Sequence, residues 1–439
     1  MSRRRIAANI GAHIGDKAVV ALVQLVTVPV LLHAWGTDGF GRWAMLATLP
    51  AFLALGDFGI VRVAGARVTA LLARGEVAAA RVAVHTAWAA TLIIVGGLAL
   101  VGTAAWAALG EAKVPGDVTP AIGWLALYGV LTIFVRLHTV MLRAAGHYQL
   151  WSWSATGFYA LDNAALLLAA AGGADFAQAA AAMALSRAAQ LLMVAITGRR
   201  WMAGVMPGLS GAARSEWAVL ARPALAASVL AIGMAAFLQG STLLLGVLAG
   251  AAAVPAFVAV RTLARLGVQA ALVVAQPLGQ EFAVARARGD ARRSGRLLAA
   301  VLGGAGLLAI GTGGALVLAG GPFIGWWTGG QIAADPALLA LMAVSTFAAV
   351  LWSALGQLAE ATNRQQALAY AHLLAGLAGL AVLGASAARW GALAAAAGFA
   401  LADMLALAAV LALTVRGWLA EPALRAGARS LLAARGGQH

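Results

Sequence analysis

The stretch VAVHTAWAATLIIVGGLALVGTAAWAAL, residues Val82–Leu109, runs without a single Asp, Glu, Lys or Arg. A helical apolar run of roughly 18 residues or more is long enough to cross the ~30 Å hydrocarbon core of a bilayer. The whole chain of 439 residues has this character, since 63% of its residues are hydrophobic and only 10% are charged. The sequence therefore predicts an all-α integral membrane protein without a separate soluble domain.

Twelve stretches of this kind follow one another along the chain, and the connections between them are short. The longest connection, Gly198 to Pro223, is too small and too rich in glycine to form a core of its own. The expected transmembrane helices are Val19–Trp35, Trp43–Ile60, Val82–Leu109, Ile122–Leu142, Trp153–Ala171, Phe176–Ile196, Ala224–Leu248, Ala253–Val274, Leu297–Leu318, Pro336–Leu358, Leu368–Ala388 and Ala392–Leu413.

The basic residues between these spans predict the orientation of the chain. If the N-terminus is cytoplasmic, almost every loop Lys or Arg lies on the cytoplasmic side, and only Arg42, Lys113 and Arg389 lie outside. Insertion favours Lys and Arg in cytoplasmic loops, so we expect an even number of spans with both termini in the cytoplasm. Membrane topology thus explains the net charge of +15 better than nucleic acid does, because the basic residues are dispersed among apolar spans.

The sequence carries no motif that indicates an enzyme or a cofactor. It has no glycine-rich phosphate loop ending in Lys-Ser/Thr and no His-Glu-x-x-His spacing, and its seven histidines are scattered. The absence of cysteine excludes disulfides and thiolate metal sites. We expect no cofactor and no metal.

An internal repeat appears when the second half is moved over the first by 214 positions. Ala73–Glu76 (ARGE) then falls on Ala287–Asp290 (ARGD), and Gly36 falls on Gly250. These matches lie at equivalent points of the span pattern, which indicates two similar six-helix lobes.

We expect an N-terminal lobe at residues 1–210 and a C-terminal lobe at residues 211–439 that ends in a short basic cytoplasmic tail. Six is an even number, so both lobes enter the membrane in the same direction. They would be related by a pseudo-two-fold axis along the membrane normal, with a central cavity between them.

Two arginines in the eighth expected span are the main candidates for a binding site. Arg261 and Arg265 are four residues apart, so they share one helix face, roughly 12–18 Å from the outer end of the span. Like charges on one face repel. Their placement is explained if the face lines an aqueous cavity that receives an anion, because guanidinium groups bind phosphate oxygens in pairs. The alternative is that they pair with acidic residues of other helices or extend toward the headgroups.

Other ionisable residues lie in or beside the spans of the first lobe. A polar inner mouth or gate would be formed by Asp16, Lys17, Asp57, Arg62 and Arg136, near the cytoplasmic ends of the first, second and fourth spans. The alternative is simple anchoring at the membrane interface.

Asp162 in the fifth span and Arg187 in the sixth are expected at similar depth on adjacent helices, where they would form a structural ion pair. Asp403 in the last span has no obvious cation beside it in the sequence, and carrying a coupling proton is a further interpretation of it.

Several segments resemble the polysaccharide-biosynthesis flippases, the O-antigen and exopolysaccharide translocases of the multidrug/oligosaccharidyl-lipid/polysaccharide exporter superfamily. In the first lobe these are Val28–Pro29, Trp35–Trp43 (WGTDGFGRW) and Leu55–Ile60 (LGDFGI); in the second they are Phe257–Leu266 (FVAVRTLARL), Pro277 and Ala287–Asp290. The resemblance covers the whole chain at the level of topology, and its motifs indicate the superfamily better than the substrate.

This resemblance implies a V-shaped, two-lobed transporter of a bacterial inner membrane. It implies that a polyprenyl-diphosphate-linked oligosaccharide moves from the cytoplasmic to the outer leaflet by alternating access, for cell-surface polysaccharide synthesis. Its partners would be this lipid-linked substrate, membrane lipids, H⁺ or Na⁺ as coupling ion, and other polysaccharide-assembly proteins. Arg261 and Arg265 would hold the diphosphate.

Three alternatives remain open from the sequence. A multidrug antiporter of the same superfamily would need an acidic or aromatic cavity for organic cations, whereas the spans of this chain hold more basic than acidic residues. A membrane polymerase or ligase of lipid-linked sugars would need a sizeable outer loop, and every expected outer loop is short. A non-transporting scaffold is opposed only by the arginines in the expected cavity.

Overall fold

The chain folds into long helices, as the computed structural model shows for residues 3–109, 116–202, 204–362 and 365–420. Every regular element in these residues is helical. The basic tail expected after the last span lies largely outside these residues, as do Lys113 and Arg364. The chain divides into two compact units, Met1–Gln239 and Gly240–His439.

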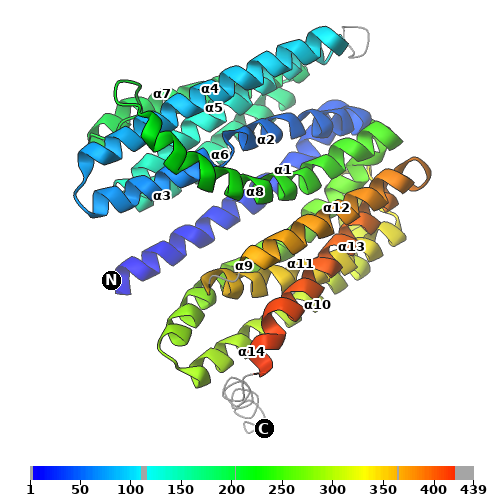
Figure 1. Cartoon of the computed structure of the whole chain (residues 1–439). Coiled ribbons are helices and arrows are strands. Elements are labelled where there is room, and N and C mark those ends of the chain that lie inside the picture. Colours follow the sequence, from blue (N-terminus) through cyan, green and yellow to red (C-terminus); the bar gives the residue numbers. More distant parts are fainter. Residues whose placement is uncertain (1–2, 110–115, 203, 363–364, 421–439) are drawn as a thin grey trace. The chain divides into compact units, whose positions relative to one another are not determined.

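The first unit begins with a long helix and then a broken one. Pairs of its helices lie side by side, such as α1 with α6 and α5 with α7 (Figure 1). Its elements are α1 (Arg3–Leu46), α2 (Thr48–Ala54), the 3₁₀ turn η1 (Leu55–Asp57), α3 (Ile60–Ala73), α4 (Val77–Leu109), α5 (Thr119–Ala144), α6 (Tyr148–Ala171), α7 (Phe176–Trp201) and the first part of α8 (Arg214–Ala249).

The second unit is built around α11, which packs against α9, α10 and α13. Its elements after α8 are η3 (Ala251–Ala253), α9 (Val254–Ala287), α10 (Ala291–Trp327), α11 (Pro336–Ala361), α12 (Gln365–Trp390), α13 (Ala392–Val410), the π-helical turn η4 (Leu411–Val415) and α14 (Arg416–Ala420). The border expected between lobes, at residues 210 and 211, falls just before α8, whereas the two units separate within α8. The lobe boundaries stay a prediction.

Each of the twelve expected spans coincides with helical structure. Within the described residues, nine segments are long and apolar enough to cross a membrane. One of them, Gly15–Asp57, contains the first expected span and most of the second. The remaining two expected spans fall on α6 and on α8, in which Ala235–Ala249 is a shorter apolar segment.

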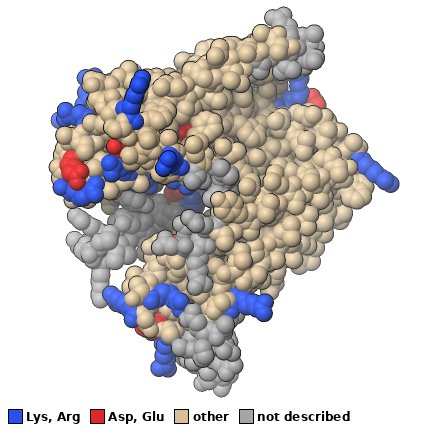
Figure 2. Space-filling model, viewed as in Figure 1, with Lys and Arg blue, Asp and Glu red and all other residues tan. Residues whose placement is uncertain are grey.

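Charged side chains gather at the ends of the helices, and the flanks of the helices are largely uncharged on the face drawn in Figure 2. Small residues let these helices approach closely, as is usual in membrane proteins. A Cβ on Gly398 of α13 would lie 2.5 Å from the carbonyl oxygen of Gly379 on α12, so these two backbones are in direct contact.

The internal repeat is visible in the backbone. Gly36 interrupts α1 with φ 68° and ψ −177°, and its counterpart Gly250 ends α8 with φ 87° and ψ 157°. Gly75 and its counterpart Gly289 have φ values of 77° and 71° in the turns before α4 and α10. Side chains are strongly disfavoured at positive φ with extended ψ, so the sequence repeat reflects a repeated way of turning the chain.

We expect Gly36→Ala and Gly250→Ala each to destabilise the protein by about 1–3 kcal/mol, because alanine is strained in this backbone region. Gly303→Ala is the matched control, since Gly303 is an exposed helical glycine of α10 with open space around its Cα. Thermal unfolding of the purified variants in detergent measures the difference. Equal stability of all three variants would contradict the claim that the positive φ values at Gly36 and Gly250 require glycine.

Candidate functional site

The second expected span, Trp43–Ile60, is not one helix but is broken close to its end at Ile60. Between α2 and α3 the chain passes through η1, and then Phe58 and Gly59 adopt φ values of 43° and 73°. The carboxylate of Asp57 stabilises this break, because its Oδ1 accepts a hydrogen bond of 2.9 Å from the Gly59 amide. Discontinuous helices of this kind expose backbone groups inside a membrane protein and recur at transport sites.

Arg136 of α5 lies against the same break. Its Nη1 donates to the carbonyl oxygen of Ala54 at 3.0 Å, and its Nη2 lies 3.6 Å from Asp57 Oδ2. The Asp57 side chain is almost fully buried, whereas 45% of the Arg136 side chain is exposed. The guanidinium therefore neutralises a buried carboxylate and caps the end of α2 while it stays accessible from one side.

The other residues expected at the inner mouth have separate surroundings. Asp16 and Lys17 form an ion pair of 3.2 Å on α1, and Thr156 of α6 donates to Asp16 Oδ1 at 2.6 Å. Arg62 is exposed on the first turn of α3, directly after the break. The structure thus brings Asp57 together with Arg136 and Asp16 together with Lys17. Their joint role as a gate stays a prediction.

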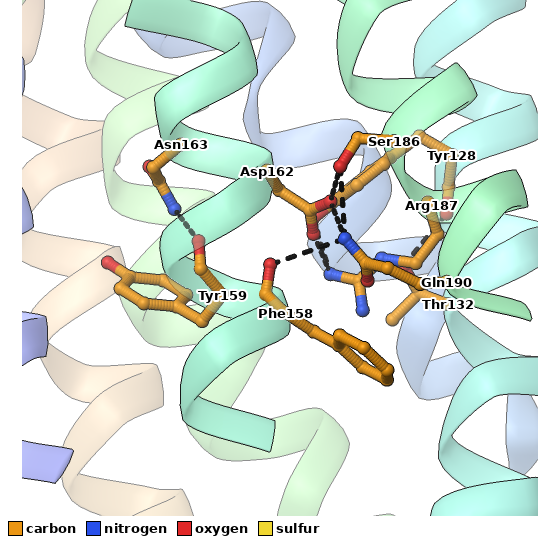
Figure 3. A network of polar contacts seen from close by, with 9 residues as sticks. All are labelled: Tyr128, Thr132, Phe158, Tyr159, Asp162, Asn163, Ser186, Arg187 and Gln190. Carbon is orange, nitrogen blue, oxygen red and sulfur yellow. Dashed lines mark hydrogen bonds and ion pairs between the residues drawn. The ribbon is translucent and has the colours of Figure 1, made fainter. Parts of the chain in front are cut away.

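Asp162 of α6 lies at the centre of a buried polar network that joins α5, α6 and α7 (Figure 3). It pairs with Arg187, and it accepts hydrogen bonds from Ser186 at 2.8 Å, Gln190 at 2.5 Å and Tyr128 at 3.0 Å. Asp162 is fully buried. A fully buried carboxylate is stabilised only if it has such partners, and this one has four.

Arg187 has two roles in this network. Besides its ion pair with Asp162, it donates to the Tyr128 hydroxyl at 2.9 Å, and its guanidinium lies 5.0 Å from the centre of the Tyr128 ring. The sequence did not indicate Tyr128, Ser186 or Gln190. Two of these residues could have been found from the sequence, because Ser186 and Gln190 are polar residues in an Ala-rich helix and lie one turn apart on the same face.

In the second unit, both candidate arginines project from α9. Arg261 is partly buried; its Nη1 donates to Thr242 Oγ1 of α8 at 2.9 Å, and its guanidinium lies 5.1 Å from the centre of the Phe257 ring. Arg265 is exposed and interacts electrostatically with Arg261 and with Asp403 of α13. The sequence shows no cation near Asp403, and the fold supplies one, Arg265 of α9.

Asp403 is held between α11 and α13 by two donors. Ser345 Oγ donates to its Oδ2 at 2.5 Å, and Trp352 Nε1 donates to its Oδ1 at 3.0 Å. Arg261, Arg265 and Asp403, with these neutral donors, form what we call the α9 cluster. It contains two guanidinium groups and one carboxylate.

The opposite face of α9 has a different character. An apolar cavity of about 370 Å³ lies there between α9 and α10, and its lining includes Leu263, Leu266 and Ala270 of α9 with Leu316 and Phe323 of α10. Since successive helix residues are 100° apart, this lining and the two arginines lie on opposite sides of α9. Among the described residues, no group of three or more His, Asp or Glu is placed to hold a metal ion.

Comparison with known proteins gives no match to a family model and no match to a curated protein sequence. Solved structures do match. The lipid II flippase MurJ in an inward closed conformation has a TM-score of 0.71 and 10% identity, covering 97% of this chain and 93% of that chain.

Two transporters of the MATE family are also similar. The MATE multidrug transporter DinF-BH, solved in complex with a ligand, has a TM-score of 0.64 and 14% identity, covering 94% and 95% of the two chains. An inward-facing multidrug resistance MATE transporter of the MOP superfamily has a TM-score of 0.62 and 14% identity, covering 98% and 100%.

The chain has the MATE/MurJ fold. This fold has twelve transmembrane helices in two lobes, and the predicted fold class is confirmed. Both kinds of neighbour belong to the MOP superfamily that the sequence resembles. The MATE/MurJ fold is that of a multi-pass membrane protein. The predicted V shape and central cavity depend on how the two units are placed, and they stay predictions.

We expect Arg187→Ala to destabilise the first unit by about 3–5 kcal/mol, because it leaves the Asp162 carboxylate buried without its cation. The double variant Asp162→Ala/Arg187→Ala should lose less than the sum of the two single variants, since no uncompensated charge remains. Arg389→Ala, at an exposed arginine, is the control. Chemical unfolding in detergent measures all four, and additive losses would contradict the pairing.

Proposed function

We propose that the protein is a membrane transporter, a flippase that moves a polyprenyl-diphosphate-linked oligosaccharide from the cytoplasmic to the outer leaflet. The observation that carries this proposal is the α9 cluster, in which two guanidinium groups lie one turn apart within a predicted membrane span and the single carboxylate, Asp403, interacts with Arg265. The fold supports the proposal, because one of its structural neighbours is a lipid II flippase.

The charge of the α9 cluster favours an anionic ligand. Two cations and one anion leave the cluster with a net positive charge, which attracts an anion. A diphosphate offers oxygens to both guanidinium groups in a bidentate manner. Thr242 and Phe257 fix the direction of Arg261, which reduces the ordering cost of binding.

The broken second span supports an inner gate in the first unit. We assign the gate to Asp57 and Arg136, and we include Arg62, Asp16 and Lys17 because we expect them at the cytoplasmic ends of their helices. Because the Arg136 side chain is half-exposed, its 3.6 Å contact with Asp57 can break and re-form as the helices move. Asp162 and Arg187 serve as a structural ion pair that stays closed throughout.

The setting that goes with this function is the inner membrane of a bacterium, with both termini in the cytoplasm. The partners are the lipid-linked substrate, membrane lipids and other polysaccharide-assembly proteins. H⁺ or Na⁺ supplies the energy for transport. Alternating access between the two lobes provides the path.

A second candidate is multidrug or cation antiport. It is favoured by the likeness to MATE multidrug transporters, one of which was solved with a bound ligand. Asp403 is the acidic group that such a transporter would use here. The positive balance of the α9 cluster opposes the capture of a cation, so we rank this function second.

The discriminating experiment measures leaflet translocation in reconstituted vesicles. We expect the native protein to move a lipid-diphosphate-sugar, and Arg261→Ala/Arg265→Ala to reduce the rate at least about 100-fold, since two charged contacts are lost. Arg261→Lys/Arg265→Lys should recover only part, because lysine lacks the bidentate fork. Arg389→Ala, an exposed arginine of the same unit, should transport normally.

Transport of cationic dyes without any sugar-lipid movement would favour the antiporter. Undiminished sugar-lipid movement in the double alanine variant would contradict the role of the α9 cluster.

A further inference from the structure

The connection between α7 and α8 is not a loose linker but is docked on the first unit. Met202, at the end of α7, and Val205 are both fully buried in the core that also contains Leu220 of α8 and Ala83 and Val84 of α4. We call residues 204–213 the strap. A connection that only joined two lobes would have no reason to bury these side chains.

Three hydrogen bonds hold the strap to the N-terminal part of α4. Arg81 Nε donates to the Gly204 carbonyl oxygen at 2.9 Å, the Gly211 amide donates to His85 Nδ1 at 2.9 Å, and the Ala213 amide donates to Thr86 Oγ1 at 3.1 Å. Glycine is required against the imidazole ring, since a Cβ on Gly211 would lie 2.8 Å from His85 Nδ1. The strap is therefore fitted to α4 by both shape and hydrogen bonding.

An ion pair continues this attachment to α3. Arg67 of α3 donates to both carboxylate oxygens of Glu216, from Nε at 2.9 Å and from Nη2 at 3.4 Å. Glu216 lies in the first turn of α8, where the helix dipole favours a negative charge, and only 13% of its side chain is exposed. The hydrogen bond to Glu216 raises the pKa of Arg67 above its usual value. We call this pair the α3–α8 latch.

The attachment of the strap to α4 belongs to the junction and not to the repeat. With the same offset of 214 positions, the counterparts of Arg81, His85 and Thr86 in the second unit are Gly295, Ala299 and Ala300. None of these can make the strap's hydrogen bonds. Since the two halves share their turns but not these polar residues, the residues serve the connection between the halves.

Through the latch, α3 connects the break in the second span to α8. α3 is the half-helix that follows the break at Phe58 and Gly59, and Arg67 lies at its middle. The first turn of α8 is joined to α3 at Arg67, and α8 continues past Gln239 into the second compact unit.

We propose that α3, the strap and the first turns of α8 form one lever, hinged at Phe58–Gly59, which carries the state of the Asp57–Arg136 contact to the helix that enters the second unit. The lever deepens the proposed function, on which its role in transport rests. The latch holds during the whole cycle, and the break is the element that bends.

Amide hydrogen exchange tests the lever without any assumption about transport. Arg136→Gln loosens the contact at the break, and we expect it to change exchange of the strap amides at residues 204–213 by at least about fivefold. In the background Arg67→Ala/Glu216→Ala this effect should disappear, because the connection is cut. The matched control is Arg74→Ala/Glu76→Ala, which removes an exposed ion pair at the end of α3 and should leave the effect intact.

A translocation assay then tests the role in transport. Arg67→Ala or Glu216→Ala should lower the rate at least about tenfold, and the exchanged pair Arg67→Glu/Glu216→Arg should recover most of it. Two results would overturn the lever. One is a rate of amide hydrogen exchange in the strap that does not change in Arg136→Gln. The other is a charge-reversed variant, Arg67→Glu/Glu216→Arg, in which the strap amides stay unprotected from exchange. If the native protein moves no sugar-lipid while the exchange coupling holds, the proposed function fails and the lever stands.

Discussion

The cost of placing a charge in hydrocarbon organises this protein. Along the described spans, buried carboxylates are held by donors from other helices, as Asp162 is by α5 and α7 and Asp403 is by α11. Isolated, each would cost at least a few kcal/mol in the bilayer. Because the partners come from different helices, satisfying one charge fixes how three helices pack. Arg187 adds a contact with the ring of Tyr128, which ties α7 to α5, whereas the contact of Arg261 with the ring of Phe257 lies within α9.

The two halves of the repeat use the same backbone turns for different purposes. Gly36 and Gly250 turn the chain alike, yet the second span is broken at Phe58–Gly59 whereas its counterpart α9 is continuous from Val254 to Ala287. The offset places Ala47 and Ala51 where α9 has Arg261 and Arg265. The first half therefore carries a bend and an inner charge pair, and the second carries the guanidinium groups. This division suits a transporter in which gate and substrate site lie on separate elements.

Hydropathy, loop charge and the repeat were enough to predict the helices and the two-lobed fold, since in a membrane every backbone group must be satisfied within helices. The contact of Asp162 with Arg187 was expected because adjacent antiparallel helices put them at equal depth. The break inside Trp43–Ile60 was not expected, because Leu55–Ile60 is largely apolar and only backbone dihedrals reveal it. The electrostatic partnership of Arg265 with Asp403 and the docking of the strap were also missed. Both depend on packing between helices far apart in sequence, which periodicity does not encode.

The most direct test of the account uses the absence of cysteine from the chain. Single cysteines at Arg265 and at Leu266 place a thiol on the arginine face or on the apolar face of α9. A membrane-impermeant thiol reagent applied to membranes is predicted to label Arg265→Cys and not Leu266→Cys. Labelling of Leu266→Cys alone, or labelling of neither cysteine, would contradict the claim that the arginine face of α9 lines the path of an anionic headgroup.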